Sequence, residues 1–423
     1  MRAAQVVVLG GGFAGLETAF SLASTVDGRA EITLVSNEDA FLFKPNTIYI
    51  PFGLDPARLL IRLDRPARRR DVRLIRATAT DVDPAGRAVR LAGDHRVEYL
   101  GYDFLVIATG AAMAADEIPG LADHAETIWS PDDMLSLRAR LLELVARAKR
   151  GESQTVLFAV PPNNKCSGPL YEIVLMLETW LHRMKIDDRV RLVFTTYEHG
   201  YIQAFGPKLD AVVREEFAAR GITGRVGERL VRVDPQHASY ESGHTEPYDL
   251  LIAFPPYIAA RRFEGLTSDA RGFLATDLLS RRVQGTDNVY APGDAGDFPV
   301  KQAFLAFLEA DAVADDIAMQ ILGTSRRRGF DPVSMCVMEE LDKAAFAQMP
   351  LELTGDPEHP VAVRAGADGA YRVGVSPLWR LGKKALAVYL PMRFKAGRPF
   401  HAGAPWAAMD ASLRVMSTLL ART

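Results

Sequence analysis

Three glycines near the start of the chain constrain its fold more than any other feature. Gln5 to Leu9 is a short apolar run, and Gly10, Gly12 and Gly15 follow it in the pattern Gly-x-Gly-x-x-Gly. Leu16 to Ser24 then has the pattern of a helix. A strand, a glycine-rich turn and a helix in this order let the backbone approach a pyrophosphate closely, and the helix N-terminus faces its negative charge. The pattern therefore predicts an α/β unit that binds a dinucleotide.

Two later segments also run from an apolar strand into small residues. They are Tyr102 to Gly110 and Asn288 to Asp294. Together with the first motif, they resemble the three FAD signatures of the flavoproteins that have two dinucleotide-binding domains. The resemblance implies that the protein binds FAD and that Asp294 contacts its ribityl chain. It also implies a discontinuous FAD-binding domain, because the third signature returns after the middle of the chain.

The middle of the chain repeats the strand–helix order of the start. We therefore predict an α/β fold with two Rossmann-like domains, as in glutathione-reductase-like flavoproteins, and a C-terminal amphipathic membrane-associating segment. The expected boundaries are 1–112 with 285–325 for the FAD-binding domain, 113–284 for the second domain and 326–423 for the C-terminal segment. Arg326 to Arg328 are expected in an exposed linker.

The second predicted strand ends at Val35, where an acidic residue normally holds a ribose. Ser36 and Asn37 occupy that place, with Glu38 and Asp39 directly after them. The cofactor-binding residues that the resemblance implies are Gly10, Gly12, Phe13, Ala14, Gly15, Ser36, Asn37, Lys44, Thr109, Gly110, Gly293, Asp294 and Lys301.

A second glycine fingerprint is absent where the middle domain begins. The predicted strand Thr155 to Val160 runs into Pro161, Pro162, Asn163 and Asn164 instead. Proteins of this superfamily that use NADH carry a glycine fingerprint here, and a Pro-Pro pair cannot hold a pyrophosphate in the same way. We therefore expect an electron donor other than NADH.

The chain has two cysteines, Cys166 and Cys336. Cys166 begins the stretch Cys-Ser-Gly-Pro-Leu-Tyr-Glu at a helix entry. This stretch resembles the sulfide:quinone oxidoreductase family, which has Cys-x-Gly-Pro-x-Tyr-Glu there. The resemblance extends to Met335-Cys336-Val337, to the Pro255-Pro256 pair and to Lys301, so it spans nearly the whole chain. In the family, the two cysteines face the flavin and carry sulfur between them. The flavoprotein subunit of flavocytochrome c sulfide dehydrogenase has a similar pair.

For each candidate catalytic residue there is also a simpler, non-catalytic interpretation. A thiolate is a soft nucleophile that can attack sulfur, but free cysteines are most often small buried apolar side chains. Glu172 is either a base beside Cys166 or an ordinary helix carboxylate. Lys301 either supplies a cation that favours reduced flavin or lies on the surface. No metal site is expected, because neither cysteine has ligands at metal-binding spacing.

The chain departs from the family at several places. Ile128-Trp129-Ser130 stands where many members have a third cysteine, Asp133 replaces a histidine, and Phe307 stands near a usual glutamate. Residues 41–46 contain no cysteine to tether a flavin, so FAD is expected to be non-covalent.

The tail has an unusual charge pattern. Residues 369–409 contain seven Arg or Lys residues and no Asp or Glu, although the net charge of the chain is -3. Trp406, Met409, Leu413, Met416 and Leu420 recur at helical spacing. The pattern favours an interfacial anchor whose apolar groups also include Trp379, Leu386, Tyr389, Leu390, Met392 and Phe394. The alternative is that both helices bury these stripes against the protein.

These features predict an enzyme that oxidises sulfide and passes electrons through FAD to a membrane quinone. We expect a peripheral, monotopic protein of a prokaryotic inner membrane, with homo-oligomers possible. The balanced charge gives no indication of nucleic-acid binding. Two other functions stay open, a type-II NADH dehydrogenase and a sulfide-oxidising flavoprotein that reduces a cytochrome c. The arginines at 65, 68, 69, 70, 73 and 76 are expected to form a solvated face.

Overall fold

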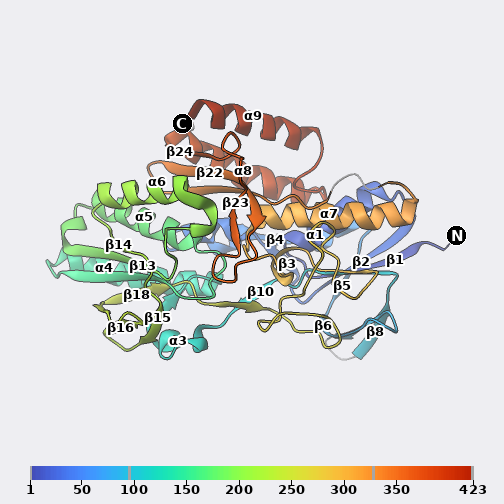
Figure 1. The fold of residues 1–423 in the computed structure, drawn as a ribbon, viewed down its shortest axis with the longest axis horizontal. Coiled ribbons are helices and arrows are strands. Elements are labelled where there is room, and N and C mark those ends of the chain that lie inside the picture. The colour runs from blue at the N-terminus through green and yellow to red at the C-terminus, as the bar shows by residue number, and fades with distance from the viewer. Residues whose placement is uncertain (1, 94–96, 326–328, 421–423) are drawn as a thin grey trace.

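A computed structural model describes residues 2–93, 97–325 and 329–420. The predicted linker at Arg326 to Arg328 lies outside these residues. Figure 1 shows two α/β halves side by side, with the C-terminal elements over one edge of both.

The first half is built on a parallel sheet with the strand order β20-β9-β1-β2-β5. Its strands are β1 (Ala4–Leu9), β2 (Ala30–Ser36), β5 (Arg73–Arg76), β9 (Phe104–Ile107) and β20 (Val289–Tyr290). Successive side chains of a strand point to opposite faces. Val6 and Val8 accordingly pack with helices α1 (Phe13–Thr25) and α7 (Ala303–Leu322), whereas Val7 packs on the opposite side.

The second half repeats this plan with the parallel order β11-β18-β12-β13-β14. Its strands are β11 (Ala125–Thr127), β12 (Gln154–Val160), β13 (Val190–Thr196), β14 (Thr223–Arg225) and β18 (Leu250–Ala253). Helices α4 (Pro131–Lys149), α5 (Gly168–Arg183) and α6 (Gly206–Ala219) share one core with Phe158 of β12. The predicted fold of two Rossmann-like units is confirmed, while the exact boundaries stay predictions.

Smaller elements complete the two halves. They are β3 (Ala40–Leu42), β4 (Leu60–Arg62), β6 (Thr78–Asp83), β7 (Ala88–Ala92), β8 (Val97–Gly101), β10 (Ala111–Met113), β15 (Leu230–Val233), β16 (His237–Tyr240), β17 (Thr245–Pro247), β19 (Tyr257–Ala259), α2 (Asp64–Arg68) and α3 (Leu121–His124). Short 3₁₀ turns lie at 44–49, 56–59, 115–117, 187–189, 203–205 and 293–295.

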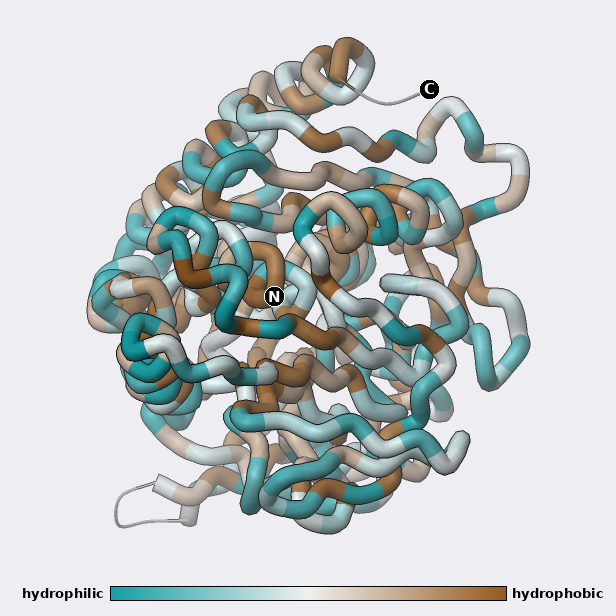
Figure 2. The backbone as a smooth tube through the Cα atoms, turned by 90° about the vertical axis from the view of Figure 1, so that its left-hand side faces the viewer, coloured by the Kyte–Doolittle hydropathy of each residue, from teal (hydrophilic) through white to brown (hydrophobic). Residues whose placement is uncertain are grey.

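The C-terminal part is an antiparallel sheet covered by two helices. The sheet contains β21 (Val333–Glu339), β22 (Ala344–Leu353), β23 (Val361–Val363) and β24 (Arg372–Ser376), and the helices are α8 (Pro377–Lys395) and α9 (Ala404–Leu420). In Figure 1 both helices lie together at the top of the molecule. Figure 2 shows hydrophobic stretches through its middle and also beside the C-terminus at its upper edge.

Several apolar side chains of the tail that were predicted to face a membrane are buried in the protein instead. Trp379 is fully buried and stacks on Phe346 of β22, with ring centroids 4.0 Å apart. Leu413 joins the same cluster, and Met409, Met416 and Leu420 pack against it; Phe394 is also buried. The assignment of these side chains to a membrane surface is wrong. Phe394 packs against Phe20 and Phe41 of the first half, and the others cover an apolar face of the sheet under α8 and α9.

Candidate active site

The three signature motifs meet at one edge of the first sheet. β20, β9 and β1 are neighbouring parallel strands, so their carboxyl ends lie at the same edge, where ligands bind in open α/β sheets. A cavity of about 690 Å³ opens there. It is lined by the predicted cofactor residues Gly10, Gly12, Phe13, Ala14, Ser36, Asn37, Lys44, Thr109, Gly110, Asp294 and Lys301.

The glycine turn has the shape that a pyrophosphate needs. Gly10 has φ +111, and a Cβ there would lie 2.2 Å from the carbonyl oxygen of Ala108. A Cβ at Gly15 would lie 2.0 Å from the carbonyl oxygen of Gly10, so only glycine allows this close packing. Gly12 faces open space, and no side chain caps the N-terminus of α1 after it. These open amides fit the phosphates of FAD.

Gly293, the last of the predicted glycines, lies in the turn directly before Asp294. It has φ +71, and its amide donates to the Glu309 carboxylate over 2.9 Å. Glu309 is buried and also accepts from Arg281 over 2.9 Å. The carboxylate thus fixes the turn that presents Asp294 to the cavity.

The end of β2 is the place where a ribose normally binds in such a fold. The Ser36 hydroxyl is buried and donates to the carbonyl oxygen of Glu38 over 2.8 Å. Asn37 and Glu38 are exposed and also line the cavity. Glu38 is the acidic side chain at this strand end that lines the cavity.

Two lysines and one carboxylate form the charged centre of the site. Burial lowers the pKa of Lys44 and of Lys301 to about 8, and Asp294 opposes this shift in both. Lys301 is only 3% exposed, and its Nζ donates to the carbonyl oxygen of Gly296. The alternative of a surface position for Lys301 is therefore wrong.

The second sheet also points its carboxyl edge at this cavity. Cys166 follows β12, Tyr257 follows the neighbouring β18, and Trp129 follows β11; all three line the cavity. The Nζ of Lys44 lies 3.2 Å from the centroid of the Trp129 ring, and Tyr257 hydrogen-bonds to Cys166. Sequence reasoning did not identify Tyr257, although it directly follows the Pro-Pro pair.

Cys336 reaches the same cavity from β21, a strand of the C-terminal sheet. The segment after the third motif links both cysteine-bearing segments. The Lys301 amide donates to the carbonyl oxygen of Lys165 over 3.0 Å, and Gln302 Nε2 donates to that of Met335 over 3.1 Å. The fold thereby brings two distant cysteines to one place.

Both cysteines are half-buried free thiols whose pKa is raised, mainly by burial. For Cys336 the pKa rises to about 12, with Glu172 raising it further and Lys383 lowering it. For Cys166, Asp294 adds to the effect of burial, while the hydrogen bond from Tyr257 lowers the pKa. Reduced thiols here are therefore protonated at neutral pH.

Glu172 is part of a buried ion pair. Its Oε1 accepts from Lys383 Nζ of α8 and from the Glu339 amide over 2.7 Å, and Lys383 also donates to the Val337 carbonyl oxygen over 2.8 Å. Burial raises the pKa of Glu172, and Lys383 opposes the shift. Glu172 lines the cavity, but it also ties α5 to the Cys336 strand and to α8.

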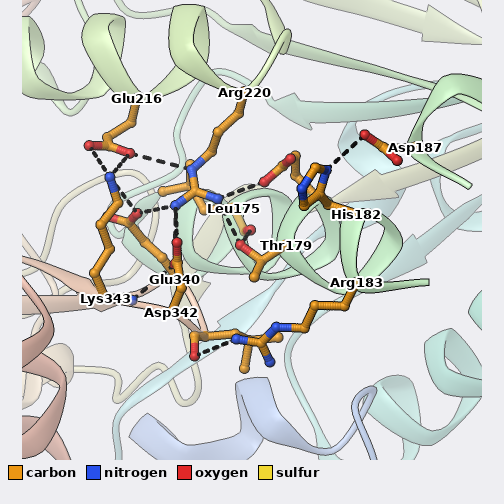
Figure 3. A network of polar contacts seen from close by, with 12 residues as sticks. Leu175, Thr179, His182, Arg183, Asp187, Glu216, Arg220, Glu340, Asp342 and Lys343 are labelled. Carbon is orange, nitrogen blue, oxygen red and sulfur yellow. Dashed lines mark hydrogen bonds and ion pairs between the residues drawn. The ribbon is translucent and has the colours of Figure 1, made fainter. Parts of the chain in front are cut away.

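Figure 3 shows a second ionic link at the far end of α5. Arg220, after α6, donates to Glu178 of α5 over 2.6 Å and to Glu340 over 2.7 Å. Lys343 Nζ donates to Glu216 of α6 over 2.7 Å. Glu340 and Lys343 lie at the tip of the β21–β22 hairpin, so this cluster holds the strand of Cys336 against the helix that follows Cys166.

Known proteins share this architecture. Residues 4–152 match the family described as pyridine nucleotide-disulphide oxidoreductase. The chain is 26% identical to the sulfide-quinone reductase of Aquifex aeolicus over 62% of this chain and 59% of that relative. It is 26% identical to external alternative NAD(P)H-ubiquinone oxidoreductase B2 of Arabidopsis thaliana, over 69% of this chain and 54% of that relative. The aligned parts thus span less than two thirds of both relatives.

Among solved structures, the X-ray structure of the Aquifex aeolicus sulfide:quinone oxidoreductase matches with a TM-score of 0.83 and 20% identity. The match covers 97% of this chain and 96% of that chain. Fold and motifs define a flavoprotein oxidoreductase with two dinucleotide-binding units, and its cofactor is FAD. Within this class, the chain is similar to sulfide:quinone oxidoreductases both in sequence and in fold.

Proposed function

We propose that the protein oxidises sulfide to sulfur or polysulfide and passes the electrons through FAD to a membrane quinone. One observation carries this proposal. Cys166 and Cys336 line the same cavity as Gly10 and Gly12 of the glycine turn and Asp294. A flavin held by that turn and a pair of sulfur-carrying side chains would share this cavity.

The cofactor would be held by residues of the first half. The Gly12 turn and the start of α1 would hold the phosphates, Glu38 and Asn37 the ribose, and Asp294 the ribityl chain. Lys301 would supply a buried positive charge, which favours the reduced, anionic form of a flavin. The chemistry that the cofactor would supply is two-electron transfer to the acceptor.

The raised pKa values of the thiols favour hydrosulfide as the first nucleophile. A protonated thiol reacts poorly, whereas hydrosulfide is already an anion near neutral pH. In the proposed step, Cys166 and Cys336 begin joined, directly or through extra sulfur. Where the bridge is a direct disulfide, hydrosulfide attacks one of its sulfur atoms and the S–S bond breaks, which leaves a persulfide on one cysteine and a thiolate on the other. Tyr257 would stabilise a thiolate at Cys166, and Lys383 one at Cys336.

Another part of the cavity lining suits a lipophilic acceptor. It includes the apolar side chains Phe304, Leu386, Ala387, Leu390 and Trp406. Three of these side chains lie on the inner face of α8. An apolar lining beside this helix is the environment that a quinone ring needs.

The outer face of α8 supports attachment to a membrane. Leu378, Leu381, Val388 and Met392 recur at spacings of three, seven and four and are between 51% and 67% exposed. Such an exposed apolar stripe is typical of a helix that lies in a bilayer surface. In the described residues, no helix is long and apolar enough to span a membrane.

Anaerobic titration of the purified protein with sulfide tests the proposal. We expect the flavin absorption band to bleach with sulfide but not with NADH. Cys166→Ser and Cys336→Ser should each prevent bleaching while FAD stays bound. Bleaching by NADH alone would favour the type-II dehydrogenase, and wild-type bleaching in either serine variant would make that cysteine structural.

The acceptor is tested separately. We expect the sulfide-reduced protein to be reoxidised by a soluble ubiquinone analogue. Reoxidation by cytochrome c and not by the quinone would contradict the quinone part of the proposal and favour the cytochrome-linked flavoprotein.

A further inference from the structure

A short arginine-rich segment of the first half packs against the end of α8. This segment comprises α2 and the two residues after it, 64–70. Arg69 Nη1 donates to the carbonyl oxygen of Lys395 over 2.8 Å, and Arg70 Nε donates to that of Gly397 over 2.5 Å. A Cβ at Gly397 would lie 2.8 Å from the carbonyl oxygen of Pro66, so the two backbones are in close contact.

This contact creates a basic cluster from two distant parts of the sequence. Its members are Arg65, Arg69, Lys395 and Arg398, and all four are exposed. In the described part of the chain, none of them forms an ion pair with a carboxylate. The nearby Asp64 pairs with Arg62 and Arg68 instead. The cluster therefore presents unneutralised positive charge.

The basic cluster is continuous with the apolar outer face of α8. Lys395 lies three residues after Met392, so it follows the exposed stripe by one helical turn. Lys384 is exposed on the same helix, between Leu381 and Val388. An apolar stripe bordered by cations matches a bilayer whose headgroups are anionic.

We propose that Arg65 and Arg69 of the first half, with Lys395 and Arg398, bind the phosphate groups of an anionic lipid bilayer. The FAD-binding half would then contact the membrane itself, in addition to the C-terminal helices. This inference rests on the membrane attachment in the proposed function. It replaces the expectation that these arginines are only solvated.

The expected loss of vesicle binding follows from the number of basic side chains that are removed from the cluster. Each basic side chain near an anionic surface strengthens binding about fivefold at low salt, and the effect falls with salt. Removing three such charges should weaken binding to anionic vesicles about 100-fold. Binding to neutral vesicles should barely change, because the apolar stripe is untouched.

The test uses the FAD-loaded, full-length protein and sedimentation with vesicles. The variant is Arg65→Gln/Lys395→Gln/Arg398→Gln, which spares the Arg69 and Arg70 hydrogen bonds. A matched control, Lys149→Gln/Arg232→Gln/Arg261→Gln, removes three exposed charges outside the cluster. The vesicles are phosphatidylcholine alone or with 30% phosphatidylglycerol.

We expect the cluster variant, and not the control, to lose binding to the phosphatidylglycerol vesicles, and 0.5 M salt to remove the difference. Equal binding by variant and control would overturn the proposal, as would equally strong binding of the wild type to soluble polyglutamate. If the wild type sediments with neither vesicle, membrane attachment fails and this inference fails with it. Sulfide-dependent reduction of a soluble quinone analogue, measured without vesicles, shows independently whether the proposed chemistry survives.

Discussion

Replacing Lys383 by methionine tests the buried ion pair that joins α8 to the cysteine site. The side chains of Lys383 and Glu172 are 11% and 10% exposed. In the variant, Glu172 keeps only the Glu339 amide as a donor among its described partners, and the Val337 carbonyl oxygen loses the Lys383 ammonium. Removing one partner of a buried pair costs about 3–5 kcal/mol, because the other charge stays buried. We expect the free energy of unfolding to fall by about this amount at pH 8.

The fall in the free energy of unfolding that Lys383→Met causes should grow as the pH rises. Burial already raises the pKa of Glu172 above its ordinary value of 4.5, and loss of Lys383 raises it further. A carboxyl whose folded pKa is raised favours the folded state when protonated. The destabilisation should therefore be small below pH 4.5 and grow as the pH rises through the raised pKa.

Denaturant unfolding, followed by tryptophan and flavin fluorescence, measures this effect. Glu172→Gln/Lys383→Met should recover most of the loss, because it removes both charges together. Lys384→Met, at the exposed neighbouring position, is the matched control and should change the free energy of unfolding by less than about 0.5 kcal/mol. Two results would refute the reasoning. One is a fall in the free energy of unfolding below about 1 kcal/mol in Lys383→Met. The other is a fall in the double variant that equals the sum of the falls in the two single variants.

Three further outcomes are expected. Acid precipitation should release all FAD into the supernatant, and flavin in the pellet would show a covalent link. Trp379→Ala should lower the free energy of unfolding by about 3–5 kcal/mol, since it empties a fully buried site stacked on Phe346; a loss under 1 kcal/mol would contradict this packing. Burial raises the pKa of Glu198 to about 7, so wild-type stability should fall relative to Glu198→Gln as the pH rises from 5 to 8. Parallel stability curves for the two proteins would exclude that assignment.

The features that were predictable from the sequence are local ones. The Gly10–Gly15 turn can be identified because strand, turn and helix lie within about 20 consecutive residues, and only glycine permits the close contact at Gly10. The meeting of the three FAD motifs also follows from sequence, since parallel strands share one carboxyl edge. Both steps depend on backbone geometry alone.

Contacts between distant side chains were not predictable. Lys383 and Glu172 are separated by 211 positions, and nothing in either local pattern selects the partner. Acid-free composition suggested that the tail lysines and arginines face lipid. Lys383 instead neutralises a buried carboxylate, and Arg380 pairs with Glu339 over 2.6 Å. A basic composition does not distinguish an internal ion pair from a membrane contact.

Helix α8 illustrates why the tail could not be oriented from its sequence. Both of its faces are apolar, so its hydrophobic pattern fits two opposite placements. The structure assigns the faces through packing: Leu386 and Leu390 line the cavity, whereas Leu381 and Val388 point outward. The same helix also carries Lys383, which contacts the strand of Cys336 through the Val337 carbonyl oxygen. One element thus borders the cysteine site, lines the cavity with apolar side chains and forms part of the outer surface. A membrane that binds its outer face would therefore also hold in place the apolar side chains that α8 presents to the cavity.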